Sequence, residues 1–232
     1  ALRAMFLLYA ALGIAGGLCY RLIPAAAAAA PENRSFALGA SRRIVLRLAA
    51  LFSIDAFAGG FAVQSLLALW LFEKFDLSLA TAGTFFFTSG LLAALSYPAA
   101  AWLAGRIGLL NTMVYTHIPS SLCLIGAALV PHLGLALALL LARAALSQMD
   151  VPTRSSYVMA VVTPAERAAA ASVTSVPRGL ASAASPALAG ALFAAGYWAL
   201  PLVICGVLKI VYDLLLLVTF RGVKPPEEIA QR

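Results

Sequence analysis

The fold is decided by the stretch Ser147–Arg178, SQMDVPTRSSYVMAVVTPAERAAAASVTSVPR, which joins two long apolar segments through a short polar turn. Before the turn, Asp150 and Arg154 stand four residues apart, so on a helix they share a face and can form an ion pair. Such a pair matters at bilayer depth, where an ionisable side chain costs at least ~2.5 kcal/mol. The stretch therefore predicts two membrane helices, one of which carries paired charges.

The turn itself has the signature of a helix start. Thr163 is placed as the N-cap, Pro164 as the first helical residue and Glu166 as the third, which is the pattern of a capping box. We expect the next helix to begin there. It continues through Pro177 and Arg178, two residues that are unusual in a simple membrane anchor.

The composition is that of a polytopic membrane protein. Of the 232 residues, 63% are hydrophobic and 11% are charged, and the mean hydropathy is +0.96. Soluble domains have roughly 45–50% apolar residues. The apolar runs are long enough for several helical spans of about 20 residues each. We therefore expect an all-α fold, a bundle of transmembrane helices.

Seven spans are predicted, with a long polar segment after the first. Their approximate bounds are residues 4–23, 46–72, 79–104, 109–130, 133–162, 165–195 and 198–220. We interpret residues 1–23 as the last helix of a missing N-terminal half, 24–45 as a cytoplasmic linker, 46–220 as a six-helix transmembrane bundle and 221–232 as a cytoplasmic tail. Because the chain does not begin with Met, we expect it to be a piece of a longer protein.

The net charge of +7 comes from basic residues at the ends of apolar segments. No basic stripe with interleaved aromatic residues points to a nucleic-acid partner. If the linker is cytoplasmic, one side of the membrane holds Arg42, Arg43, Arg47, Arg106, Arg167, Arg221, Lys224 and Arg232. The opposite side receives Arg3, Lys74 and two very short turns. By the positive-inside rule, the C-terminus is expected in the cytoplasm.

Several local patterns resemble those of one transporter family. The run Ser41–Ser65, SRRIVLRLAALFSIDAFAGGFAVQS, is similar to the start of the seventh helix in bacterial members of the major facilitator superfamily. The turn Trp102–Leu109 resembles a degraded copy of the loop motif between helices eight and nine, which keeps Arg106 and Gly108 but lacks the acid and the second base. Pro164–Arg167 resembles the loop before helix eleven.

The resemblance covers nearly the whole chain and implies its architecture. Residues 4–23 would stand for the sixth helix and the later spans for helices seven to twelve. It implies a secondary active transporter of the inner membrane that works by alternating access and is coupled to a proton or another solute. Its partners would be a small solute or drug-like molecule, the lipid bilayer and the N-terminal half of the same transporter.

Two charges are predicted at mid-membrane depth. Asp55 lies nine residues after the start of the span at residue 46, ~14 Å deep, and Arg143 lies ten residues after residue 133, ~15 Å deep from the opposite face. The two could therefore meet at one level. In the resembled family these spans line the central cavity, where an acid and a base would suit anion capture, proton coupling or an inter-helix latch.

Further candidates for substrate contact or coupling lie nearby. Asp150 and Arg154 fall on the same polar face of the fifth span as Arg143. They either take part in function or only pair with each other near the cytoplasm. We add Arg178, which lies among small residues that allow close helix contact, and Gln64.

The last span holds Lys209 and Asp213, also four residues apart, which we interpret as a structural pair. His117 and His132 are given no role. The three cysteines lie in different apolar runs without CxxC spacing, so we interpret them as packing residues and expect neither a metal site nor a disulfide.

Two other classes of function were weighed. A seven-helix receptor or retinal-type protein is the alternative that the span count and Lys209 raise. An enzyme is not expected, because the sequence has no HExxH, no GxSxG and no phosphate-binding glycine loop. No cofactor is expected for the same reason.

Overall fold

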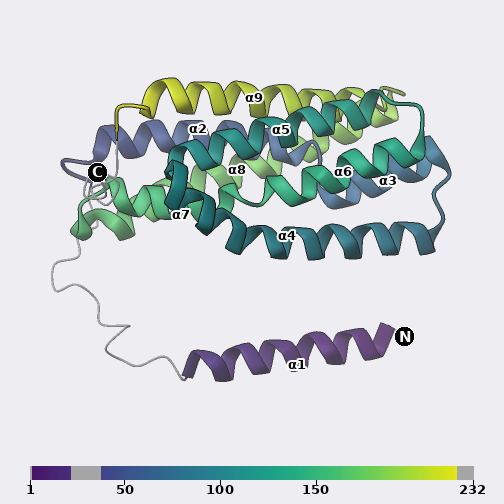
Figure 1. The fold of residues 1–232 in the computed structure, drawn as a ribbon, viewed down its shortest axis with the longest axis horizontal. Coiled ribbons are helices and arrows are strands. Elements are labelled where there is room, and N and C mark those ends of the chain that lie inside the picture. Colours follow the sequence, from purple (N-terminus) through teal and green to yellow (C-terminus); the bar gives the residue numbers. More distant parts are fainter. Residues whose placement is uncertain (1, 22–37, 224–232) are drawn as a thin grey trace. The chain divides into compact units, whose positions relative to one another are not determined.

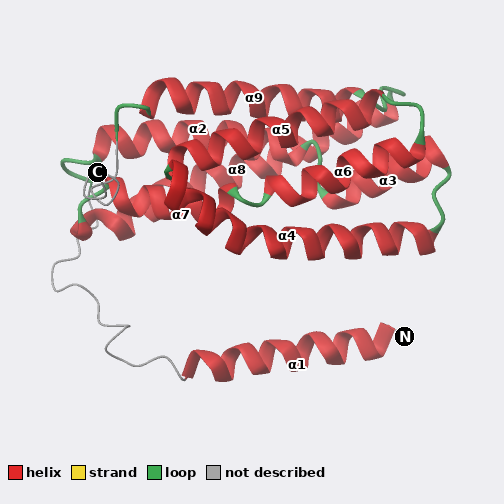
Figure 2. Ribbon diagram, viewed as in Figure 1, coloured by secondary structure: helices red, strands yellow, loops and turns green. Residues whose placement is uncertain are grey.

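The computed structural model describes residues 2–21 and 38–223, and all regular structure within these ranges is helical (Figure 2). The chain divides into two units, Ala1–Arg34 and Ser35–Arg232. Most of the predicted linker and most of the predicted tail, with Lys224 and Arg232, lie outside the described residues.

The first unit contains α1 (Leu2–Arg21), which ends on a basic residue. Its apolar stretch, Met5–Cys19, is shorter than the ~20 residues that a span needs. The helix expected at residues 4–23 is therefore present, and its role as a span stays a prediction.

The second unit is a bundle of long segments, and each segment runs antiparallel to the next one in the chain (Figure 1). The pairs α2–α3 and α6–α7 each count as one segment here. Its elements are α2 (Arg42–Gly60), α3 (Gln64–Phe75), α4 (Leu79–Ile107), α5 (Leu109–Leu129), α6 (Leu133–Ser147), α7 (Asp150–Val161), a 3₁₀ turn (Pro164–Glu166), α8 (Arg167–Ala194) and α9 (Leu200–Phe220). Helix α2 packs against α8 and α9, and α5 packs against α9 and α6. The helix α2 begins at Arg42, so the last residues of the predicted linker, 42–45, are helical.

Five segments of the described chain are long and apolar enough to cross a membrane. They are Arg42–Phe75, Leu79–Ile107, Leu109–Leu129, Leu133–Val161 and Leu200–Phe220. Helix α8 is not among them although it has 28 residues, because serine, threonine, arginine and glycine interrupt its apolar residues. The helix expected at residues 165–195 is confirmed, whereas its crossing of the membrane stays a prediction.

Two of the predicted spans are broken helices. The span expected at 46–72 is interrupted at residues 61–63, between α2 and α3, and the span expected at 133–162 is interrupted at residues 148–149, between α6 and α7. Each pair of helices still continues in one direction across the bundle (Figure 1). The breaks place irregular backbone inside the bundle.

The prediction of a capping box at the start of α8 is wrong, because its hydrogen bonds are not formed. Thr163 makes no side-chain cap bond. The Glu166 carboxylate instead accepts hydrogen bonds from the backbone N–H groups of Gly39 and Ser41, at the start of α2. The first N–H groups of a helix have no partner within it, and α2 begins beside this turn. The Ser41 side chain and then the Gly39 amide hold the pKa of the Glu166 carboxyl below its ordinary value.

The bundle has two separate apolar clusters. One, around Trp70, Leu124 and Leu140, lies between α3, α5 and α6. The other, around Phe52 and Tyr157, joins the first half of α2 to α7 and to the end of α9. The middle of the bundle lies between these clusters, and it contains charged side chains.

Candidate functional site

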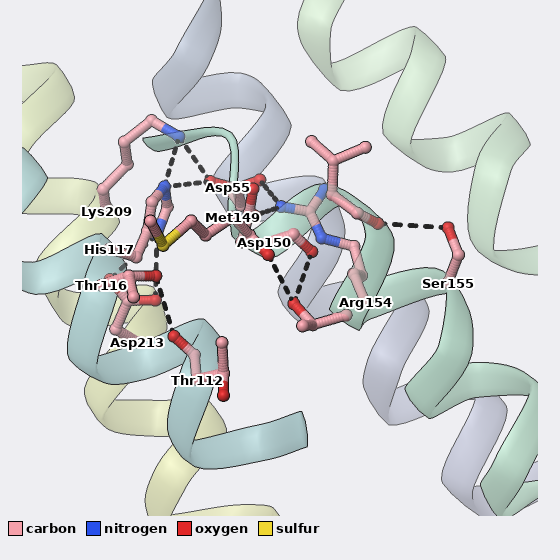
Figure 3. A network of polar contacts seen from close by, with 12 residues as sticks. Asp55, Thr112, Thr116, His117, Met149, Asp150, Arg154, Ser155, Lys209 and Asp213 are labelled. Carbon is pink, nitrogen blue, oxygen red and sulfur yellow. Dashed lines mark hydrogen bonds and ion pairs between the residues drawn. The ribbon is translucent and has the colours of Figure 1, made fainter. Parts of the chain in front are cut away.

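Asp55 on α2 is the centre of a buried charge network (Figure 3). The residue is 3% exposed. Oδ2 accepts a hydrogen bond of 2.8 Å from Nη2 of Arg154 on α7, and Oδ1 accepts one of 2.6 Å from Nζ of Lys209 on α9. One carboxylate therefore connects cations from two different helices.

Arg154 is held by a second carboxylate, that of Asp150, one helical turn earlier. Its guanidinium lies 5.2 Å from the centre of the Phe52 ring, a distance at which a cation is attracted to an aromatic face. Asp150 is in the first turn of α7, where the helix dipole favours a negative charge. The pair predicted from the four-residue spacing is confirmed, and it is joined to Asp55.

On the other side of Asp55, the network continues through a histidine. Lys209 Nζ lies 3.3 Å from Nε2 of His117 on α5, and His117 Nδ1 lies 3.0 Å from both carboxylate oxygens of Asp213. One tautomer satisfies both contacts, with Nδ1–H donating to Asp213 and the Nε2 lone pair accepting from Lys209. The interpretation of Lys209 and Asp213 as a local pair is wrong, because His117 lies between them.

The network borders a cavity of ≈190 Å³. Arg143, Arg178, Ser147 and Gln148 are part of its wall, together with Asp55, Asp150, Arg154, His117 and Lys209. Gln148 is in the break between α6 and α7, so the broken helix contributes to the cavity. Broken helices line substrate and ion sites in membrane transporters.

The structure sorts the predicted site residues into three groups. Asp55, Asp150 and Arg154 are bonded together. Arg143 and Arg178 line the same cavity as Asp55, so Asp55 and Arg143 do lie near each other, while the Asp55 carboxylate is paired with Arg154 and Lys209.

The remaining candidates lie elsewhere. Gln64 lines a second cavity of ≈380 Å³. Arg106 lies over the ring of Trp102, 4.2 Å from its centre. Gly108 joins α4 to α5 with φ 88°, a value that favours glycine. These two loop residues are not in the cavity walls described above.

Sequence reasoning missed three members of the network: His117, Lys209 and Asp213. Each of the three is an ionisable residue inside an apolar span, a feature that by default indicates a functional site. We did not apply this criterion to Lys209 and Asp213, because their four-residue spacing offered each side chain a partner on its own helix.

Helices of this length and apolarity, with charges buried between them, define an integral membrane protein built as a helix bundle. The sequence profile of the Major Facilitator Superfamily matches residues 56–232, and the chain belongs to this family. The resemblance inferred from the local patterns is thereby confirmed at the level of the superfamily.

The chain is also similar to the uncharacterized membrane protein YJR124C of Saccharomyces cerevisiae. The two are 26% identical over 198 residues, which cover 83% of this chain and 44% of the yeast protein. The chain therefore spans less than half the length of this curated relative.

Proposed function

We propose that the chain forms the C-terminal six-helix half of a secondary active transporter, which moves a small solute across the membrane by alternating access. Family membership supports the class of protein. The observation that carries the proposal is the buried network around Asp55, which connects α2, α5, α7 and α9 beside a cavity.

The network can respond to a solute because its bonds are exchangeable. Asp55 joins Arg154 on α7 to Lys209 on α9. A solute that competes for either cation changes which helices are held together, and alternating access requires such a change between packed helices. A ligand shifts a conformational equilibrium only by its differential interaction with the two states.

We propose the proton as the coupling ion, because the carboxylates of the network outnumber its permanent cations by one. Its three carboxylates belong to Asp55, Asp150 and Asp213, and its permanent cations are Arg154 and Lys209. Whether the group is neutral therefore depends on one proton, which His117 or a carboxylate can hold. Ionisable groups in such positions form proton relays in transporters.

The Asp55→Asn variant tests the proposal. The native polypeptide is reconstituted in vesicles with an acidic exterior, and uptake of a panel of anionic, neutral and cationic solutes is measured. We expect pH-gradient-driven uptake to fall at least ~10-fold, because a hydrogen bond to a charged group is worth about 1.5–3 kcal/mol. Unchanged uptake would remove Asp55 from the mechanism.

Asp76→Asn is the matched control. Asp76 is exposed at the end of α3 with φ 49°, a backbone conformation that Asn adopts as readily as Asp. This variant makes the same chemical change outside the network, so uptake is expected to stay at the wild-type level. The seven-helix receptor raised by the span count is not proposed, since membership of the Major Facilitator Superfamily supports a transporter instead.

A further inference from the structure

The cavity beside Asp55 has more cations than carboxylates in its wall. Arg143, Arg154, Arg178 and Lys209 line it, against Asp55 and Asp150. The two carboxylates are bonded to Arg154 and Lys209. Arg143 and Arg178 form no ion pair within residues 38–223, so the lining has two guanidinium groups without a carboxylate partner.

A buried hydroxyl in the same cavity also lacks a partner. Ser121 on α5 is 1% exposed, and its Oγ makes no hydrogen bond within the described chain. A buried hydroxyl without a partner costs free energy, so its presence in a cavity wall points to a bound acceptor. Two guanidinium groups and a hydroxyl are together a donor set that suits an oxyanion.

The neighbouring cavity shares part of this wall and has a group of apolar side chains in its lining. It measures ≈380 Å³ and includes Arg143 together with Phe85, Phe86, Leu67 and Leu140. This volume falls in the range of about 300–1,000 Å³ that is usual for small-molecule sites. Arg143 therefore lines both cavities, and the second one adds apolar side chains within reach of it.

We infer that the substrate is an organic anion whose oxyanion group binds between Arg143 and Arg178 and whose apolar body lies against Phe85 and Phe86. The inference rests on the proposed transport function and names the substrate class of the same site. Arginine suits this role because its planar guanidinium donates two parallel hydrogen bonds to a carboxylate. A cationic solute would meet two guanidinium groups that are not in an ion pair within the described chain.

Binding to the full chain in lipid nanodiscs tests this inference without requiring transport. The probes are 2-naphthoate, its neutral isostere 2-naphthamide, the cation 2-naphthylmethylammonium, and acetate, which lacks the apolar body. Equilibrium dialysis is expected to show the tightest binding for 2-naphthoate. Arg143→Gln and Arg178→Gln should each weaken it roughly 10- to 100-fold, the effect of losing a hydrogen bond to a charged group.

Three controls separate a binding role from a structural one. Arg221→Gln changes an exposed arginine at the end of α9 and should leave naphthoate binding unchanged. Naphthamide binding should not change in any variant. Arg143→Lys and Arg178→Lys keep the charge and should restore part of the lost affinity, which loss of folding would not allow.

The possible outcomes distinguish this inference from the proposed function. Equal affinity for naphthoate and naphthamide, or preference for the ammonium probe, would overturn the anion assignment. If either of these results were found together with vesicle uptake of a neutral or cationic solute, the anion assignment would be wrong and the proposed transport function would still hold. Arginine-dependent naphthoate binding without uptake of any solute would support the anion site and contradict transport.

Discussion

Asp55 shows why a buried charge points to function more than to stability. Taking an ion pair out of water usually costs about as much as the pair's attraction returns, and apolar replacements are often neutral or stabilising. Asp55 nevertheless holds both Arg154 and Lys209 in a region that is almost inaccessible to water. The bundle would not need this arrangement for packing alone, which is our physical reason for proposing that Asp55 takes part in transport.

Glu166 provides a pH-dependent contact at the end of the bundle. Its folded-state pKa is lowered, so its ionised form contributes stability above the ordinary glutamate pKa of about 4.3, and this contribution is lost as the pH falls through the lower folded value. We expect Glu166→Gln to unfold at a lower temperature than the wild type at pH 7. The difference should shrink toward zero on acidification to about pH 3.

Thermal unfolding in detergent between these pH values checks the Glu166 prediction. Glu73→Gln is the control, since Glu73 is exposed on α3 and makes no described hydrogen bond or ion pair. Its melting temperature should follow that of the wild type. A Glu166→Gln deficit that stayed constant with pH would show that shape, and not charge, connects this turn to Gly39 and Ser41.

The network shows how far residue spacing predicts partners. The spacing of Asp150 and Arg154 correctly indicated a pair, because both side chains lie on one face of α7. The same spacing failed for Lys209 and Asp213, because His117 of α5 and Asp55 of α2 lie within reach of them. Spacing determines neighbours on one helix, and only tertiary packing determines which neighbour is bonded.

At the scale of the element, the contact between α2 and α8 depends on Gly60, a residue without a side chain. A Cβ on Gly60 would overlap Ser185 Oγ and would lie 3.0 Å from the Ser182 carbonyl oxygen. We expect Gly60→Ala to lower the free energy of unfolding by roughly 1–3 kcal/mol, the usual cost of overpacking. Unfolding by SDS titration in mixed micelles measures the change.

Gly83→Ala on α4 is the matched control for this contact. A Cβ there would meet nothing within 4 Å, so the change should be neutral or should stabilise the helix by up to about 1 kcal/mol through helix propensity. Equal effects of the two substitutions would mean that Gly60 acts through the backbone and not through contact with α8.

The helix boundaries were predictable where a residue signals them. The starts expected at residues 79, 109 and 133 agree with α4, α5 and α6. Ser78 caps α4 by accepting a hydrogen bond from the Thr81 N–H, and Gly108 has the positive φ that ends a helix. The break at Gln148 and Met149 lies in the polar run before Pro152, which has no N–H to donate to the Gln148 carbonyl, so this proline was a signal that we did not use.

At the scale of the bundle, basic residues gather at one end. Of the described residues, this end holds Arg42, Arg43, Arg47, Arg106, Arg167 and Arg221. At the other end, Lys74 donates hydrogen bonds to the carbonyl oxygens of Ala128 and Val130, near the end of α5. This cation is therefore engaged in closing a helix terminus, as basic groups commonly are.

The asymmetry predicts the orientation of the bundle, since loops rich in arginine stay in the cytoplasm. Single cysteines at His132 and Gly222 mark the two ends in a background that carries Cys19→Ser, Cys123→Ser and Cys205→Ala; both positions are exposed. In intact spheroplasts, a membrane-impermeant maleimide should label His132→Cys at least ~10-fold faster than Gly222→Cys, because the bilayer core of about 30 Å excludes the charged reagent. Opening the membrane should make the two rates similar. Faster labelling of Gly222→Cys in intact spheroplasts would contradict this orientation and would place the arginine-rich end outside the cytoplasm.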